Sequence, residues 1–154
     1  MDKARPVVTP CEAWLSVELS SPKVDTTEYQ SAVGSLIYLT LGTRPDLAFA
    51  VGQVARFIHD PREVHWLAVK RILRYVAGTL DLTLYYTRKV TPCIVGYSDA
   101  SYANDTDDRK STGGYIFLRC GGAISWCSRK QHCVAKSTME SEYIALSDCV
   151  SEAL

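Results

Sequence analysis

The chain has 154 residues, of which 47% are hydrophobic and 22% are charged, so it can form one ordinary domain or two small units with modest cores. Its 17 basic residues equal its 17 acidic residues, which excludes a polyanion binder that acts through net charge, although local basic clusters can still contact phosphates. The six cysteines show no Cys-x-x-Cys spacing, no signal peptide is evident and no apolar run could span a bilayer, so we expect reduced thiols in an intracellular protein, cytoplasmic or nuclear and not secreted.

The first half of the chain predicts an extended segment followed by three helices. Residues 1–24 contain Pro6, Pro10 and Pro22 and show no sustained hydrophobic period, so we expect an extended lead-in. After this segment, helix start signals alternate with apolar residues at helical spacing and with glycine stops. The predicted helices cover residues 27–41, 45–59 and 61–78. The first helix is expected to place its apolar residues on one side: Val33, Leu36, Ile37 and Leu41.

The second half of the chain shows patterns typical of strands and then of a helix. Leu82–Thr87 has a period of two, which predicts a strand. Runs rich in β-forming residues predict three antiparallel strands over 93–100, 114–120 and 123–128. A final helix is expected to begin at Ser137 or Thr138, and because it reaches Leu154 without a stop signal, we expect a cut in a longer sequence. Its predicted apolar side contains Met139, Tyr143, Leu146 and Val150.

An aspartate at the end of a predicted strand and a glutamate on the final helix form the candidate chemical site. Asp99 closes the first of the three strands, whereas Glu140 and Glu142 both lie on the helix. Successive helical residues rotate by about 100°, which places Glu142 about 40° from the centre of the apolar arc and Glu140 about 120° away. Glu142 is therefore expected to face the sheet, with an edge glutamate that reaches solvent as the alternative. Such a pair of carboxylates can hold a divalent metal beside a phosphodiester.

The order of several sequence blocks resembles a known family. Four blocks in the second half, at 98–100, 109–115, 124–131 and 137–143, resemble the start of the ribonuclease H in Pol polyproteins of copia-type retrotransposons. Three blocks in the first half, at 29–38, 43–46 and 71–79, resemble the segment that follows the reverse-transcriptase palm in the same polyproteins. The resemblance extends from about Ala4 to the last residue, and the aspartates of the polymerase itself are missing.

This resemblance implies a mixed α/β (α+β) fold in three parts. Residues 1–24 would be the lead-in, 25–91 a helical reverse-transcriptase tail similar to a thumb or connection, and 92–154 a truncated ribonuclease H with a three-stranded antiparallel sheet and one helix. In the family, four carboxylates hold two Mg²⁺ ions that hydrolyse the RNA strand of an RNA:DNA hybrid. Asp99 and Glu142 would be catalytic residues and metal ligands. The other two ligands would lie beyond Leu154, so we expect weak Mg²⁺ binding and little or no catalysis by this chain alone.

The resemblance also implies partners. The expected partners are an RNA:DNA hybrid or a template-primer, and the remaining polyprotein segments, but not a membrane. Lys70, Arg71 and Arg74 form a basic stripe that could follow a nucleic-acid backbone, although a solvated helix face is the simpler interpretation. The residues expected to contact nucleic acid around the candidate site are Arg109, Lys110, Lys130, Gln131, Lys136 and Ser137. The alternative function is that of a non-catalytic remnant that binds nucleic acid or another protein.

Overall fold

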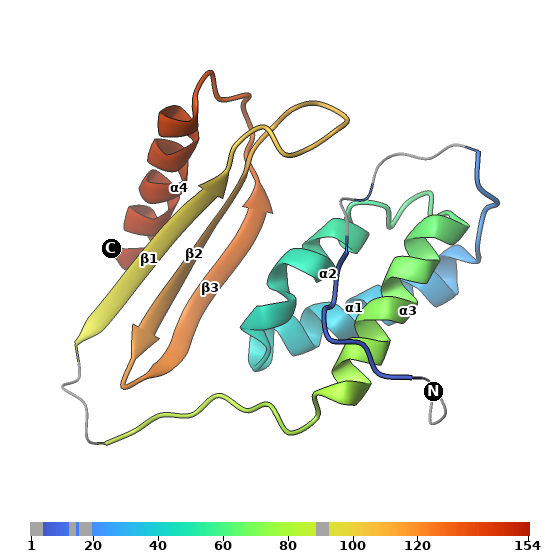
Figure 1. Ribbon diagram of the computed structural model, residues 1–154, viewed down its shortest axis with the longest axis horizontal. Helices are drawn as coiled ribbons and strands as arrows, with labels where there is room; N and C mark the ends of the chain where they lie inside the picture. Colours follow the sequence, from blue (N-terminus) through green and yellow to red (C-terminus); the bar gives the residue numbers. More distant parts are fainter. Residues whose placement is uncertain (1–4, 13–14, 16–19, 89–92) are drawn as a thin grey trace. The chain divides into compact units, whose positions relative to one another are not determined.

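The computed structural model describes residues 5–12, 15, 20–88 and 93–154 (Figure 1). These residues contain four α-helices, one 3₁₀ helix and a three-stranded antiparallel sheet, which confirms the predicted mixed α/β class. The chain forms two compact units, Met1–Thr83 and Leu84–Leu154. The predicted boundary after residue 91 falls outside the described residues. The identification of the two parts with a reverse-transcriptase tail and a truncated ribonuclease H stays a prediction.

The first unit is helical, as its periodicity predicts. Asp25 caps the first helix because its Oδ1 accepts a hydrogen bond of 2.9 Å from the backbone N–H of Glu28. The second predicted helix is shorter than expected, because it begins with a 3₁₀ turn and ends at Ala55 instead of His59. The elements of this unit are α1 (Thr26–Gly42), η1 (Pro45–Leu47), α2 (Ala48–Ala55) and α3 (Glu63–Gly78).

The core of the first unit lies where these helices pack on one another. Burial of Val33 and Leu36 on α1 is confirmed, but Leu41 is 74% exposed, so its predicted burial is wrong. Thr40 takes the last core position of the helix instead, and its hydroxyl donates a hydrogen bond to the Leu36 carbonyl. The buried cluster consists of Tyr29, Val33, Leu36, Leu47, Ala50, Val51, Val54, Val69 and Ile72.

A network of hydrogen bonds connects the loop after α1 with the end of α3. The buried guanidinium of Arg44 forms two hydrogen bonds with the Asp46 carboxylate, at 2.8 and 3.0 Å. It also donates to the carbonyl and the hydroxyl of Thr79, at 3.1 and 2.7 Å. Tyr75 donates to the same Asp46 carboxylate at 3.0 Å. The network therefore joins two segments that are distant in the sequence.

The second unit is an antiparallel sheet with one helix on one of its faces (Figure 1). The three strands pair in the order β1-β2-β3, as expected from the runs of β-forming residues. Gly121 has a φ of +84°, which the tight turn between the last two strands requires. The elements are β1 (Ile94–Ser101), β2 (Thr112–Arg119), β3 (Gly122–Lys130) and α4 (Thr138–Ala153).

The strand predicted over Leu82–Thr87 does not form, so this prediction is wrong. The segment is instead attached to the β2–β3 turn by single contacts. Tyr86 donates its hydroxyl proton to the Ala123 carbonyl, and the backbone N–H of Thr87 donates to the Cys120 carbonyl. Alternating apolar and polar residues do not form a strand unless a neighbouring strand supplies backbone hydrogen bonds.

The helix α4 packs on the sheet through small residues. Its buried positions are Ser141, Ala145 and Cys149, which recur every four residues. The predicted apolar side is therefore wrong: those residues are largely exposed, with Met139 at 71% and Tyr143 at 70%. The small side chains allow a close approach, because a Cβ added to Gly113 would lie 3.3 Å from the Cβ of Ala145.

Candidate functional site

Asp99 lies on β1, on the sheet face that α4 does not cover. Residues paired directly across antiparallel strands share a face, and successive residues on a strand alternate between faces. Gly113 faces Ala145 of α4 and pairs with Ala100, so Ala100 is on the α4 side. Its neighbour Asp99, which pairs with Gly114, is therefore on the opposite face, where its side chain is exposed.

Glu142 lies on the exposed part of α4. At about 100° per residue, Glu142 lies about 60° from the centre of the buried arc that Ser141, Ala145 and Cys149 form, so it is at the edge of the packed face, and its side chain is exposed. The alternative of an edge glutamate that reaches solvent therefore describes Glu142 better than a side chain directed at the sheet.

Neither Asp99 nor Glu142 belongs to a cluster of three potential metal ligands among the described residues. Within the described ranges, no group of three or more histidine, cysteine, aspartate or glutamate side chains could hold a metal ion. Asp99 lies on the uncovered face of the sheet, and Glu142 lies on the helix that covers the other face. These residues therefore do not fit Mg²⁺ by themselves, and their catalytic and metal-binding roles stay predictions.

The first turn of α4 separates the two candidate glutamates. The Ser137 hydroxyl accepts a hydrogen bond of 3.2 Å from the backbone N–H of Glu140. The Glu140 carboxylate in turn accepts one of 2.6 Å from the backbone N–H of Lys136. Glu140 and Ser137 thus cap the helix in the manner of a capping box. This structural task for Glu140 leaves Glu142 as the better candidate for chemistry, as the sequence indicates.

Lys130 is held by carboxylates of the loop between β1 and β2. Its ammonium lies 2.9 Å from Asp105 Oδ2 and 2.8 Å from Asp108 Oδ1. Asp105 is only 2% exposed, so the ammonium compensates a buried charge. The hydrogen bond from Lys130 holds the pKa of Asp108 below its usual value. Lys110 lies 3.7 Å from the same Asp108, so both lysines already have acidic partners.

Gln131 joins the end of the sheet to α4. It is 4% exposed, its backbone N–H donates to the Ser111 carbonyl, and its Nε2 donates to the Ser141 carbonyl. A phosphate cannot reach a side chain that is buried in this way. Among the six predicted nucleic-acid contacts, Arg109 and Lys136 have exposed side chains. These two are the positions best placed to contact a ligand from solution.

Two polar contacts that the sequence analysis missed hold α4 on the sheet. Arg129 forms an ion pair of 2.9 Å with Asp148, and Ser125 donates to Glu152 at 2.7 Å. The spacing of Asp148 and Glu152 by one helical turn was the available signal for this acidic edge. Burial raises the pKa of the Cys127 thiol, which lies between these two contacts on the strand. A raised pKa keeps this thiol protonated and unreactive.

Comparison with known proteins gives several close relatives. The chain is 51% identical over 126 residues to a protein described as secreted RxLR effector protein 161 of Plasmopara viticola, with 82% of the chain and 89% of that protein covered. It is 47% identical over 162 aligned positions to the retrovirus-related Pol polyprotein from transposon TNT 1-94 of Nicotiana tabacum, with 99% of the chain and 12% of the polyprotein covered. It is 43% identical over 151 positions to the corresponding polyprotein from transposon RE2 of Arabidopsis thaliana, with 97% and 10% covered.

The relatives differ greatly in length. The chain spans about a tenth of each of these polyproteins but most of the effector protein. The same segment therefore occurs inside long proteins and as nearly the whole of a short one. No family model and no solved structure matches the chain. No helix in the described part of the chain is both long and apolar enough to cross a membrane.

Proposed function

The chain belongs to the family of copia-type retrotransposon Pol polyproteins, and from this we propose that it is the segment in which the reverse transcriptase ends and ribonuclease H begins. The observation that carries the proposal is the similarity to polyproteins of this family, at 43 to 47% identity over nearly the whole chain. The change from a helical unit to a sheet-containing unit supports it, because the two enzyme parts would differ in this way.

The parent activity would be RNA-directed DNA synthesis with Mg²⁺-dependent hydrolysis of the RNA strand of RNA:DNA hybrids. We expect this chain to be inactive alone. The described residues hold no cluster of three metal ligands, and both candidate carboxylates are exposed. Asp99 and Glu142 would act only where further carboxylates complete the site. Partners would be a hybrid or a template-primer and other segments of the polyprotein, inside the cell in the cytoplasm or the nucleus.

Cleavage of a labelled RNA:DNA hybrid in the presence of Mg²⁺ tests this proposal. The chain is compared with a longer one that carries the following segment of a related polyprotein at its end. We expect cleavage by the long chain only, and its loss in Asp99→Asn and Glu142→Gln. Asp81→Asn and Glu63→Gln are matched controls, because both residues lie in the helical unit. Robust cleavage by the short chain, abolished by Asp99→Asn, would contradict the expected inactivity.

The second candidate function is that of a non-catalytic module that binds nucleic acid or another protein. It is favoured by the effector relative, of which this segment makes up 89% and which therefore has little length for a second catalytic half. In this case, hybrid binding should not require Mg²⁺ and should persist in Asp99→Asn and Glu142→Gln. It should weaken when Arg109 and Lys136 are changed to glutamine, since both side chains are exposed. Fractionation of cells that express the chain would separate the proposed intracellular location from secretion.

A further inference from the structure

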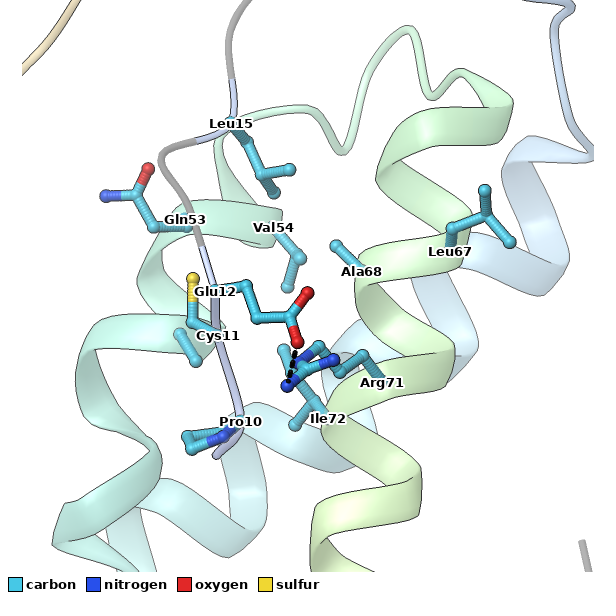
Figure 2. Close-up of a pocket in the computed structure, with 11 residues that line it drawn as sticks. Pro10, Cys11, Glu12, Leu15, Gln53, Val54, Leu67, Ala68, Arg71 and Ile72 are labelled. Carbon is cyan, nitrogen blue, oxygen red and sulfur yellow. Dashed lines mark ion pairs between the residues drawn. The ribbon is translucent and has the colours of Figure 1, made fainter. Parts of the chain in front are cut away.

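Residues 5–12, here called the strap, lie across helices α2 and α3 of the first unit (Figure 2). The Arg71 guanidinium on α3 forms an ion pair of 2.6 Å with Glu12 and donates a hydrogen bond of 3.0 Å to the Thr9 hydroxyl. One turn further along the helix, Arg74 donates to the Arg5 carbonyl at 2.8 Å. The two arginines of the basic stripe are therefore both occupied by the strap.

The strap follows one narrow face of α3. At about 100° per residue, Leu67, Arg71, Arg74 and Gly78 fall within an arc of about 60°. Gly78 leaves room for the start of the strap, because a Cβ at this position would lie only 2.7 Å from the Cβ of Pro6. The strap thus covers the face along which the arginines are aligned, and Lys70 lies at the border of that face.

The attachment of the strap is weak in physical terms. Glu12 is 71% exposed, and ion pairs of this kind contribute little to stability because water screens them. Val8 is 92% exposed and adds no apolar burial, so the apolar contact of the strap with the buried cluster is made by the partly buried Cys11. A cavity of about 270 Å³ remains between the strap and the helices, lined by residues that include Leu15, Val54 and Ile72 (Figure 2). A segment held in this way can detach without unfolding the three-helix core.

We propose that the strap and the phosphates of a nucleic acid compete for Arg71 and Arg74. The Glu12 carboxylate takes the position at Arg71 that a phosphate oxygen would take, since both are anionic acceptors that suit a guanidinium. Detachment of the strap exposes two arginines beside Lys70, on a surface that can follow a phosphate backbone. The choice of nucleic acid as the competitor rests on the proposed function, whereas the occlusion of the arginines rests on the contacts of the strap.

Fluorescence anisotropy with a labelled RNA:DNA hybrid tests the competition. Glu12→Gln removes the charge and keeps the size of the side chain, and Glu63→Gln makes the same charge change at an exposed position on α3. We expect Glu12→Gln to bind the hybrid about two- to fivefold more tightly at low salt, and Glu63→Gln to bind like the wild type. The double variant Glu12→Gln/Arg71→Gln should lose this gain.

Two further readouts separate competition from a general charge effect. The plot of log affinity against log salt should be steeper for Glu12→Gln than for wild type by about one unit, because one more phosphate contact forms. Addition of hybrid to the wild type should speed amide exchange in residues 7–9 and leave the α1 core protected.

Equal effects of Glu12→Gln and Glu63→Gln would overturn the inference and leave the proposed function intact. Absence of hybrid binding in every variant would overturn the inference too. The cleavage assay on the longer chain would remain an independent test of the proposed function.

Discussion

Gly113 on β2 and Ala145 on α4 lie so close that a Cβ on the glycine would be 3.3 Å from the Cβ of the alanine. This approach sets how closely the helix packs on the sheet. It also establishes which sheet face the helix covers, and therefore that Asp99 is on the other one. The position of the candidate carboxylates thus follows from a contact between two of the smallest residues in the unit.

We predict that Ala145→Leu destabilises the second unit by about 2 to 4 kcal/mol, because the larger side chain cannot fit against Gly113 without moving the helix. Leu146→Ala is the matched control. Leu146 is 47% exposed, so its truncation should cost less than about 1 kcal/mol. Urea unfolding followed by far-UV circular dichroism measures both. A larger loss for Leu146→Ala would mean that the helix packs through its apolar side.

The sequence predicts where the helices and strands of this chain lie better than it predicts which side of each is buried. The helices and three paired strands follow from periodicity, glycine turns and caps such as Asp25. The buried side of α4 was missed because Ser141, Ala145 and Cys149 form it, and these residues give little hydrophobic signal. The strand expected at Leu82–Thr87 does not form. A strand needs a neighbouring strand with which its backbone can form hydrogen bonds, and an alternating sequence does not show whether such a neighbour exists.

The same holds for the candidate site: the sequence identifies residues better than it predicts their positions relative to one another. The sequence identifies Asp99 and Glu142 as residues of interest, but their relative placement depends on strand register and on helix rotation, which a single sequence does not fix. Lys130 and Gln131 were expected to contact phosphates. The structure gives them partners in the β1–β2 loop and on α4, at distant positions in the chain. These contacts depend on how the strands pair, so a single sequence does not predict them.

The Arg44 network should make the first unit sensitive to acid. Burial raises the pKa of the Asp46 carboxyl, but hydrogen bonds from Arg44 and Tyr75 outweigh it and hold the pKa below its ordinary value. A lowered pKa in the folded state stabilises the protein above the unfolded pKa of about 3.9, and this stabilisation is lost as the pH falls through the folded value.

We therefore predict that Asp46→Asn costs about 1 to 2 kcal/mol at pH 7, because Arg44 stays buried without its anionic partner. The difference between variant and wild type should shrink as the pH falls below the unfolded value of about 3.9 and through the lower pKa of the folded carboxyl. Urea unfolding at pH 7 and pH 3 provides the measurement. Asp81→Asn, at an exposed position, should show no such dependence. A difference that is equal at both pH values would contradict the role of this ionisation.

Replacement of Lys130 should loosen the loop between β1 and β2. Lys130→Met removes the cation that faces the buried Asp105, and we predict a loss of about 1 to 3 kcal/mol. Amide exchange within residues 103–110 should become faster. Lys136→Met is the control, because Lys136 is exposed and its side chain can be changed without uncovering a buried charge. Unchanged stability of Lys130→Met, combined with weaker hybrid binding, would instead support the original prediction of a phosphate contact.

The first turn of α4 offers a test that distinguishes the two glutamates. Ser137→Ala should cost about 1 kcal/mol, because it removes the acceptor for the Glu140 N–H. Glu140→Gln should have a smaller effect, since an amide oxygen can still accept from the Lys136 N–H but without the charge near the helix N-terminus. Glu142→Gln should leave stability unchanged, because the side chain is exposed. Thermal unfolding of the three variants measures these effects.

A loss of stability for Glu142→Gln as large as that for Ser137→Ala would show that Glu142 has a structural role. Such a result would weaken the case for Glu142 as a metal ligand.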